Sequence, residues 1–373
     1  MSKEYTCLGM MSGTSGDGVD ASIIRSNGLD ELTVLKEKYY EYDENLFREF
    51  QSLKKKINFL NDLEKYSSSI KKLENDITIF HAKAIKDICT EFDVDLIGFH
   101  GQTLYHNPQE KISLQLGNGN LLSQLSNKKI VFNFRKNDII NGGEGAPLTP
   151  IFHKHLLKSK NVELPACILN IGGISNLTII KNLNNHDISS KDIGPGNCLI
   201  NTWVQIHTKD KFDFEGKISS RGKVNEIILE QALETYENNF KVKNNFSLDT
   251  NDFDISFARG LNLEDGAATL TVFSAKIISS KINLLLKEFN KENIKIIICG
   301  GGRKNINLIK QIKNNSKKNL SFYNSEDFGL DGDFIESQAF GYLAVRSVLS
   351  LPISFPKTTG CSAPCTGGEL INF

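Results

Sequence analysis

The sequence predicts an α/β protein of two related lobes, and two hairpins are the main reason. The stretch from Tyr5 to Arg25 consists of an apolar run, a loop of small residues and a second apolar run. The stretch from Ala166 to Ile180, about 160 residues later, has the same pattern. An apolar run on each side of a small-residue loop is typical of a β-hairpin. Because strand-like and helix-like segments alternate over the rest of the chain, we expect layered α/β architecture with one hairpin in each lobe.

Both hairpin loops have a composition that suits a phosphate group. Glycines let a backbone approach a ligand closely, and consecutive N–H groups together with hydroxyls can hold phosphate. We therefore predict that a nucleotide contacts two sets of loop residues: Gly13, Thr14, Ser15, Gly16, Asp17, Gly18, Val19 and Asp20 in the first loop, and Gly172 and Gly173 in the second. On this interpretation a side chain at Gly18 would block the approach of the phosphate.

The alternative is a tight turn without a ligand. It stays open for Gly172 and Gly173, because glycine pairs are common in turns. It is weaker for the first loop, since two residues suffice to join two strands and this loop adds hydroxyls and carboxylates. Neither G-x-x-x-x-G-K-[ST] nor a G-x-G-x-x-G that opens a helix follows the first strand, which argues against a P-loop enzyme and a dinucleotide-binding dehydrogenase.

Composition excludes several other classes. The chain has 373 residues, enough for two domains, and its 44 Lys and Arg residues balance 44 Asp and Glu residues. The net charge therefore does not favour binding to nucleic acid or to an acidic membrane. No apolar stretch is long enough to span a membrane, and seven scattered cysteines fit a reducing cytoplasm. Cys361 and Cys365 have no His or second Cys pair nearby in the sequence, so zinc is not expected there.

Further candidates follow predicted strands, where ligands of α/β sheets bind. A short strand from Asp95 to Phe99 is expected to end in a loop that carries His100, Gln102 and Thr103. We interpret Gln102 and Thr103 as ligand contacts, whereas His100 is either a contact or a core histidine. Lys129–Asn133 is the next expected strand, followed by Arg135 and a glycine-rich loop up to Pro147.

The second half of the chain offers a carboxylate and a third glycine loop. A strand is expected to end at Asp192, whose side chain either faces a cleft or caps the Gly-Pro-Gly turn that follows. A buried strand from Lys295 to Cys299 leads into Gly300, Gly301 and Gly302, which permit a flat adenine–ribose unit to approach. Asp331–Glu336 then leads into the last helix, which extends to Leu349.

These segments together resemble a known family. Gly9-Met-Met-Ser-Gly-Thr-Ser-Gly-Asp-Gly-Val-Asp20 resembles the N-terminal signature of the anhydro-N-acetylmuramic acid kinases. The resemblance continues in order along the chain through His100–Thr103, Phe134–Asp138, Gly142–Pro147, Leu169–Asn176, Asp192–Asn197, Cys299–Gly302 and Asp333–Phe340.

The resemblance implies the two-lobed fold of actin and hexokinase, a duplicated ribonuclease-H-like fold with ATP in the interlobe cleft. We expect residues 1–133 to form the first lobe, with 333–373 packing back onto it. Residues 134–332 are then the second lobe, which holds the second phosphate loop, the catalytic carboxylate and the adenosine loop. The implied reaction, in cytoplasmic recycling of peptidoglycan sugars, converts 1,6-anhydro-N-acetylmuramate, ATP and water to N-acetylmuramate 6-phosphate and ADP.

The resemblance also implies roles for individual residues. Asp192 matches the general base that activates water, and Gln102, Thr103, Arg135 and Glu336 are the expected sugar contacts. Mg²⁺ should bridge the phosphates, with Asp17 and Asp20 holding it through water. The sequence leaves the oligomeric state open, a homodimer included.

Three departures from the family pattern bear on specificity. Gly16 replaces a Leu or Met, and Asn133 replaces an Asp whose charge would face the cleft. The P-K-S motif of the family is only partly kept in Asn245–Asp249, where Phe246 replaces the Lys. Two alternatives therefore stay open: a kinase of the same fold for another sugar, and a catalytically silent sugar sensor. The absence of an appended helix-turn-helix and the retention of every acidic candidate argue against the sensor.

Overall fold

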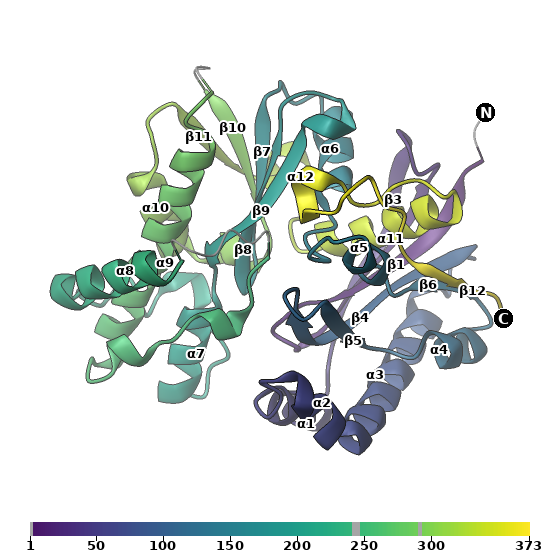
Figure 1. The fold of residues 1–373 in the computed structure, drawn as a ribbon, viewed down its shortest axis with the longest axis horizontal. Helices are drawn as coiled ribbons and strands as arrows, with labels where there is room; N and C mark the ends of the chain where they lie inside the picture. The colour runs from purple at the N-terminus through teal and green to yellow at the C-terminus, as the bar shows by residue number, and fades with distance from the viewer. Residues whose placement is uncertain (1–2, 241–246, 290–292) are drawn as a thin grey trace. The chain divides into compact units, whose positions relative to one another are not determined.

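The chain folds into two compact units. The computed structural model describes residues 3–240, 247–289 and 293–373, so Asn245 and Phe246 of the degraded motif lie outside the described residues. Unit 1 comprises Met1–Asn161, Leu183–Ile188 and Asp333–Phe373, and unit 2 comprises Val162–Asn182 and Ser189–Gly332. Residues 134–161 thus belong to unit 1, and the chain passes to unit 2 after Asn161 instead of after Asn133 (Figure 1).

Unit 1 is built on a mixed sheet. Its strands are β1 (Tyr5–Ser12), β2 (Gly18–Ser26), β3 (Leu32–Glu41), β4 (Leu96–Asn107), β5 (Ile112–Leu116), β6 (Lys129–Phe132) and β12 (Glu369–Ile371). They lie in the order β12-β6-β4-β1-β2-β3, with β5 paired to β4. The hairpin β1–β2 is antiparallel, whereas β1–β4 and β4–β6 are parallel. The predicted N-terminal hairpin is therefore confirmed.

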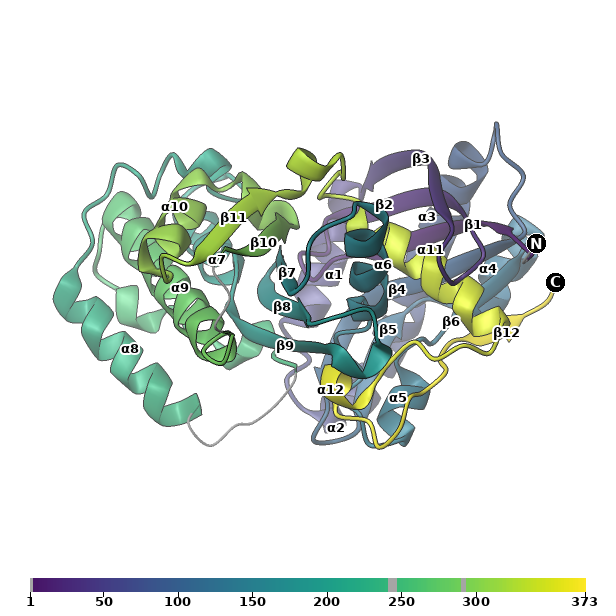
Figure 2. The same ribbon diagram turned by 90° about the horizontal axis from the view of Figure 1, so that it is seen from above.

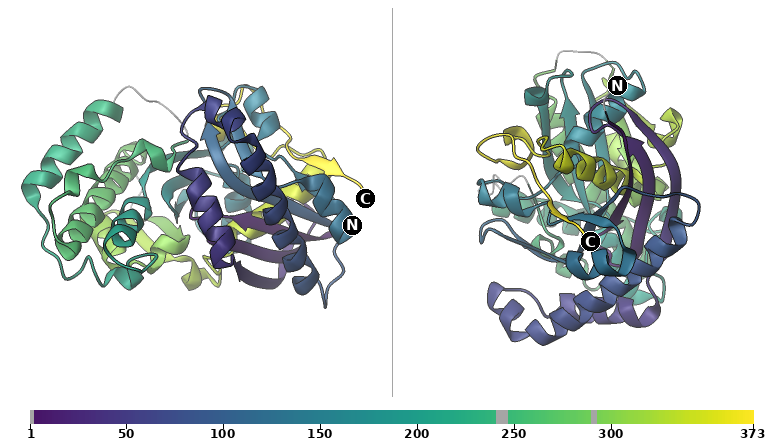
Figure 3. Two further views of the ribbon diagram at one scale, coloured as in Figure 1. Left: turned by 90° about the horizontal axis from the view of Figure 1, so that it is seen from below. Right: turned by 90° about the vertical axis from the view of Figure 1, so that its right-hand side faces the viewer.

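Helices cover both faces of this sheet. They are α1 (Glu44–Lys54), α2 (Leu60–Lys65), α3 (Ser67–Ile88), α4 (Gly119–Ser126), α5 (Lys136–Ile140), α6 (Pro150–Ser159), α11 (Ile335–Val348) and α12 (Pro356–Thr359). Leu8 and Met10 of β1 are buried with Ile77 and Ile85 of α3, while Gly9 between them faces α11. Successive residues of a strand point to opposite faces, so α3 and α11 lie on opposite sides of the sheet (Figure 3).

Helix α11 approaches the strands so closely that no side chain fits between their backbones. A Cβ atom on Gly9 would fall 1.9 Å from the carbonyl oxygen of Ser337, and one on Gly98 would fall 2.3 Å from that of Phe340. On the helix side, Gly341 lies against Gly9 and Ile24. Glycine is therefore required at Gly9 and Gly98 for the helix to lie along the sheet as Figure 2 shows.

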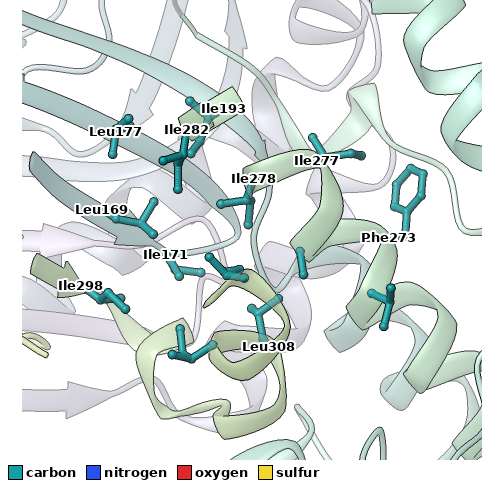
Figure 4. Close-up of a cluster of buried hydrophobic side chains, with 14 of the residues drawn as sticks. Leu169, Ile171, Leu177, Ile193, Phe273, Ile277, Ile278, Ile282, Ile298 and Leu308 are labelled. Carbon is teal, nitrogen blue, oxygen red and sulfur yellow. The ribbon is translucent and has the colours of Figure 1, made fainter. Parts of the chain in front are cut away.

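Unit 2 repeats the arrangement with a smaller sheet. Its strands are β7 (Ala166–Ile171), β8 (Ile174–Ile180), β9 (Ile188–Pro195, whose first residue belongs to unit 1), β10 (Ile294–Cys299) and β11 (Leu320–Asn324). Its helices are α7 (Cys198–His207), α8 (Glu226–Phe240), α9 (Leu263–Leu285) and α10 (Ile306–Asn315). Figure 4 shows the core, in which Ile277, Ile278 and Ile282 of α9 lie among Leu169, Ile193 and other apolar side chains of the sheet.

The two sheets share one topology. The order β6-β4-β1-β2-β3 in unit 1 corresponds to β11-β10-β7-β8-β9 in unit 2. In each unit an antiparallel hairpin is followed by a strand parallel to the first strand of that hairpin. The predicted duplicated α/β fold is confirmed.

Two strand predictions were wrong in length. The strand expected to end at Phe99 continues as β4 to Asn107, because it pairs with β1 as far as Gln102 and with β5 from there on. Gln102 and Thr103 thus lie in a strand and not in a loop. The strand expected to end at Asp192 continues to Pro195, so this carboxylate projects from within β9.

Within the ranges that the structure describes, no helix combines the length and apolarity needed to cross a membrane.

The contact between α11 and β1 gives a stability prediction. Gly9→Ala should lower the free energy of unfolding by about 2 kcal/mol or more, because overpacking forces backbone shifts. Gly13→Ala is the matched control, since a Cβ there meets only Ser15 Oγ at 3.6 Å and should change stability by less than about 0.5 kcal/mol. Urea denaturation of the two variants measures both changes in the free energy of unfolding. Equal midpoints would contradict the close contact between helix and strand.

Candidate functional site

The N-terminal loop, Gly13–Asp17, is held by its carbonyl groups. Gln102 donates to Gly13 O at 2.8 Å, Lys54 to Thr14 O at 2.9 Å and Gln51 to Ser15 O at 2.6 Å. The C=O and N–H of a trans peptide point in opposite directions, so the N–H groups of Thr14 and Ser15 point away from these anchors. Both residues are exposed. The loop therefore offers two N–H donors and the Thr14 hydroxyl on its outer side, as a phosphate site requires.

A buried polar network lies beneath this loop. The Ser12 hydroxyl lies 3.2 Å from Tyr42 Oη and 3.4 Å from His81 Nε2, and Tyr42 Oη donates to Gln102 at 3.5 Å. His81 Nδ1 donates to Ile77 O at 2.8 Å, so its Nε2 is the acceptor. Burial lowers the pKa of His81 to about 4, which keeps the ring neutral near pH 7. The network links the end of β1 to Gln102, which in turn binds the loop.

Gln102 therefore has a different role from the predicted one. Its side chain is fully buried, and both ends of its amide bind other groups of unit 1. In this unit it positions the N-terminal loop instead of presenting an amide to a sugar. Sequence reasoning missed Tyr42 and His81, because their partners are 30 and 69 residues away from them.

Asp17 and Asp20, the predicted magnesium carboxylates, lie on either side of Gly18 in the chain. The Ser15 hydroxyl donates to Asp17 Oδ1 at 2.6 Å. Burial and then the charges of Asp17 and Asp20 raise the pKa of Tyr39, so both carboxylates lie near this phenol. In the described part of the chain no third His, Cys, Asp or Glu completes a metal-ligand group with them. Two carboxylates suit Mg²⁺, which keeps several waters and takes phosphate oxygens as ligands.

The predicted effect of a side chain at Gly18 is wrong. A Cβ there would fall 2.4 Å from Tyr40 O and 2.5 Å from Tyr39 Oη, so this side of the glycine faces β3 and not a ligand. Gly16 is also enclosed, since a Cβ would fall 2.1 Å from the Phe50 ring. Val19 is fully buried in the core and offers only its backbone. Gly13 is the glycine of this loop beside which space is open.

Arg135, a predicted sugar contact, is oriented by His100. Its Nε and Nη2 lie 3.2 and 3.0 Å from His100 Nε2, and its Nη1 donates to Gly145 O at 3.4 Å. His100 Nδ1 donates to Gly101 O at 2.8 Å, which leaves Nε2 as the acceptor. Burial and the Arg135 charge hold the pKa of His100 well below its usual value. His100 is thus a buried, neutral histidine that fixes the guanidinium.

Glu336 and Thr103 lie at the same end of the unit 1 sheet. Glu336 is half-buried in the first turn of α11, and it precedes Ser337, whose hydroxyl lies 2.6 Å from that of Ser22. Asp20 lies two residues from Ser22 on the same face of β2, on the side of the loop. Thr103 accepts from Gln115 at 3.3 Å on β4. Unit 1 therefore brings the N-terminal loop, Asp20 and Glu336 to one edge of its sheet.

Asn133, predicted to depart from the family pattern, contacts the C-terminal strand β12. Its φ of 53° lies in the left-handed region, which Asn tolerates, and its amide donates to Glu369 Oε2 at 3.0 Å. Glu369 also forms an ion pair with Lys136 at 2.7 Å. An Asp at position 133 would place a second carboxylate against Glu369, so the amide matches its partner on β12.

In unit 2 the loops predicted to bind phosphate and adenosine are neighbours. β7 and β10 are parallel, with Asn170 opposite Cys299, so Gly172–Gly173 and Gly300–Gly302 follow adjacent strands at one edge of the sheet. Cys299 Sγ donates to Asn170 Oδ1 at 3.7 Å across this pair. Gly300 has a φ of 77°, and a Cβ there would fall 2.3 Å from Asn170 Oδ1. This close approach requires glycine.

The Gly300–Gly302 turn has an open side and a supported side. A Cβ on Gly301 would meet no atom within 4 Å. On the other side Arg303, whose side chain is largely buried, donates to Gly300 O at 3.1 Å and pairs with Glu326 at 2.6 Å. Sequence reasoning missed this arginine, although it directly follows the three glycines.

Polar atoms beside the second phosphate loop lack partners. Among the described residues, Ser175 Oγ and Asn176 Oδ1 are buried without a hydrogen bond. The carbonyls of Gly172 and Gly173 accept from the N–H groups of Asn197 and Gly196 at 2.9 and 2.8 Å. The loop is thus fastened to the turn after β9, and unsatisfied polar groups of this kind favour a polar ligand.

Asp192, the predicted general base, projects from β9 toward the segment that begins at Ser247. The N–H of Leu248 donates to its Oδ2 at 2.8 Å. Leu248 belongs to the stretch in which the family motif is degraded, so that stretch contacts the predicted base. The same strand continues into the turn whose N–H groups bind Gly172 and Gly173.

The chain is similar to known proteins along its whole length. The sequence model described as anhydro-N-acetylmuramic acid kinase matches residues 5–372. The anhydro-N-acetylmuramic acid kinase of Pelagibacter ubique is 52% identical over 376 residues, which cover 100% of this chain and 99% of that protein. The protein of the same name from Rhizobium johnstonii is 37% identical over 374 residues, which cover 98% of each chain. The chain therefore belongs to the anhydro-N-acetylmuramic acid kinase family, and the predicted family is confirmed.

Likeness to solved structures is more distant. The activator of the 2-hydroxyisocaproyl-CoA dehydratase from Clostridium difficile with bound ADPNP aligns with a TM-score of 0.44 at 11% identity, covering 93% of this chain and 96% of that one.

The open space beside Gly13 gives a sharper binding test than Gly18. Gly13→Val should weaken ATP binding at least about tenfold while the protein stays folded, because the side chain meets only Ser15 within unit 1 and extends into the space proposed for phosphate. Calorimetric titration with ATP measures the loss. Unchanged affinity in folded Gly13→Val would remove this loop from the nucleotide site.

Proposed function

We propose that this protein phosphorylates 1,6-anhydro-N-acetylmuramate with ATP and opens its anhydro bridge with water. The products are N-acetylmuramate 6-phosphate and ADP. Membership of the kinase family supports the reaction. The observation that carries the proposal is that each unit holds a glycine loop at the carboxyl edge of parallel strands, with unused donors or open space beside it. Such edges are where α/β sheets bind ligands.

The residues present fit a nucleotide with its magnesium ion. The outward N–H groups of Thr14 and Ser15 and the hydroxyl of Thr14 suit phosphate oxygens, and the open side of Gly301 suits the adenosine. Asp17 and Asp20 would hold Mg²⁺ through water. When bound, ATP supplies the γ-phosphoryl group and Mg²⁺ neutralises its charge, and the residues named here bind and orient them.

Asp192 would act as the general base. Its carboxylate takes a proton from the water whose oxygen attacks the anomeric carbon, and the bond from that carbon to O6 breaks as O6 bonds to phosphorus. The Leu248 N–H at 2.8 Å fixes the orientation of the carboxylate. A carboxylate held by a backbone donor keeps its direction during proton transfer, and such bases contribute about 10²- to 10⁴-fold to the rate.

Arg135, Glu336 and Thr103 are the proposed sugar contacts. The guanidinium of Arg135 is held by His100 and Gly145, and a guanidinium binds carboxylates with high specificity. A muramic acid carries such a carboxylate on its lactyl group. Glu336 and Thr103 can accept from sugar hydroxyls.

We further propose that the reaction takes place in the cytoplasm, as part of peptidoglycan sugar recycling. No disulfide joins any of the cysteines, Cys7, Cys89, Cys167, Cys198, Cys299, Cys361 and Cys365, in the described structure, as expected of a reducing compartment. Kinase activity on another sugar remains the alternative, because Phe246 replaces a family lysine close to the segment that contacts Asp192.

An assay over a small panel of sugars tests the proposal. Purified protein with Mg-ATP should release ADP with the anhydro-sugar and not with N-acetylglucosamine or N-acetylmuramate. The product mass should equal the substrate plus one water and one phosphoryl group. In oxygen-18 water the product phosphate should stay unlabelled. A product without the added water, or higher turnover of another sugar, would overturn the substrate assignment.

The carboxylate of Asp192 can be tested separately. Asp192→Asn keeps the size of the side chain and an acceptor for the Leu248 N–H but removes the proton acceptor. The kcat should fall at least about 100-fold, while calorimetric ATP affinity stays within about twofold. Asp210→Asn, an exposed carboxylate of the same unit, is the control and should keep the kcat. A fully active Asp192→Asn would leave Glu336 as the next carboxylate to test.

A further inference from the structure

A buried cluster in unit 1 joins two thiols to a carboxylate. One ligand atom each from Asp138, Cys361 and Cys365 lies within 4.8 Å of the other two. The three residues are 1%, 2% and 6% exposed. Asp138 lies in α5, whereas the cysteines follow α12 more than 200 residues later. The expectation from the sequence rested only on His and Cys close to the C-x3-C pair, whereas the third group is a carboxylate from a distant part of the sequence.

The carboxylate of Asp138 has only neutral partners in the described residues. The hydroxyls of Ser354 and Thr359 donate to Oδ1 at 2.5 and 2.6 Å, and the N–H of Gly145 donates to Oδ2 at 2.7 Å. No Lys, Arg or His of the described residues pairs with it. A buried carboxylate without a cation carries a desolvation cost that hydrogen bonds offset only in part. A bound cation beside the thiols would offset the rest.

We propose that Asp138, Cys361 and Cys365 form a binding site for a soft divalent cation of the zinc class. Thiolate and carboxylate ligands of this kind favour Zn²⁺ over Mg²⁺, which takes oxygen ligands. Zinc–sulfur bonds of about 2.3 Å in a tetrahedron place two sulfurs about 3.8 Å apart, which is compatible with ligand atoms that all lie within 4.8 Å of one another. Water would take the fourth position, and Ser354 and Thr359 would orient the ligating carboxylate.

Such an ion would fasten the C-terminal segment to α5. Asp138 is bound through Oδ2 to Gly145, whose carbonyl accepts from Arg135. The ion would therefore stabilise the backbone that orients Arg135. This site is separate from the Mg-ATP residues and does not depend on the proposed reaction.

Cobalt binding tests the proposal. Co²⁺ added to metal-free protein, without nucleotide and with a phosphine reductant, should bind once per chain and give the near-ultraviolet absorption of a thiolate–cobalt bond. Zn²⁺ should displace it. Cys361→Val and Cys365→Val should each abolish this absorption, and both should keep the fold because valine fills a similar volume. Cys89→Ala, an unclustered thiol of the same unit, should retain the absorption.

Asp138→Asn separates the carboxylate from the thiols. It should weaken cobalt binding at least about tenfold while thiolate absorption persists at saturation. No stoichiometric thiolate absorption in the reduced, folded protein would overturn the proposal. Absorption that survives both Cys→Val substitutions would do the same, since the ion would then bind elsewhere.

Discussion

The close contact of α11 with β1 and β4 is the constraint on which unit 1 depends. Two strand glycines, Gly9 and Gly98, remove the side chains that would keep the helix backbone from the sheet. The helix comes from the end of the chain and the strands from its beginning, so the contact closes the unit. It also sets the position of Glu336, because the first turn of α11 then lies at the edge where β1 ends in the N-terminal loop. A side chain at either glycine would displace the core and the candidate site together.

The duplicated sheet explains why the glycine loops occur where they do. In both units the first strand of the hairpin is parallel to the next strand of the sheet, so the hairpin loop emerges beside the carboxyl end of that neighbour. In unit 1 the neighbouring strand carries Gln102, whose side chain occupies the space beside the hairpin loop and binds the loop. In unit 2 the neighbouring strand leads into Gly300–Gly302, which have no side chains and leave the space beside the loop open. One topology thus yields a glycine loop supported by Gln102 in one unit and two adjacent glycine loops in the other.

Local patterns in the sequence were sufficient to predict the hairpins, the buried strand before Gly300 and the duplicated fold. The errors concern features that depend on distant partners. β4 extends past Phe99 because β1 and β5 supply hydrogen bonds, and the chain leaves unit 1 after Asn161 because α6 packs against α11, where Phe152 meets Tyr342. No pattern in the sequence predicted the hydrogen-bond network of Ser12, Tyr42 and His81. The apolar stripe of the helix that contains His81 predicted only that this histidine faces the core. The structure shows the surroundings of Gly16, Gly18 and Gln102, as reported above. The roles of the other site residues stay predictions.

The segment around Arg135 shows how a departure from a family pattern can be compensated within the chain. Asn133 and Lys136 bind Glu369, Asn137 donates to Thr366 O at 2.7 Å, and Asp138 accepts from Ser354 and Thr359. Each of these contacts ties the segment to the C-terminal part of the chain. An acidic residue at position 133 would repel Glu369, whereas the amide of Asn133 donates to it. With its neighbours held in this way, Arg135 is the residue of the segment that points to His100 and Gly145, which fix the direction of its guanidinium.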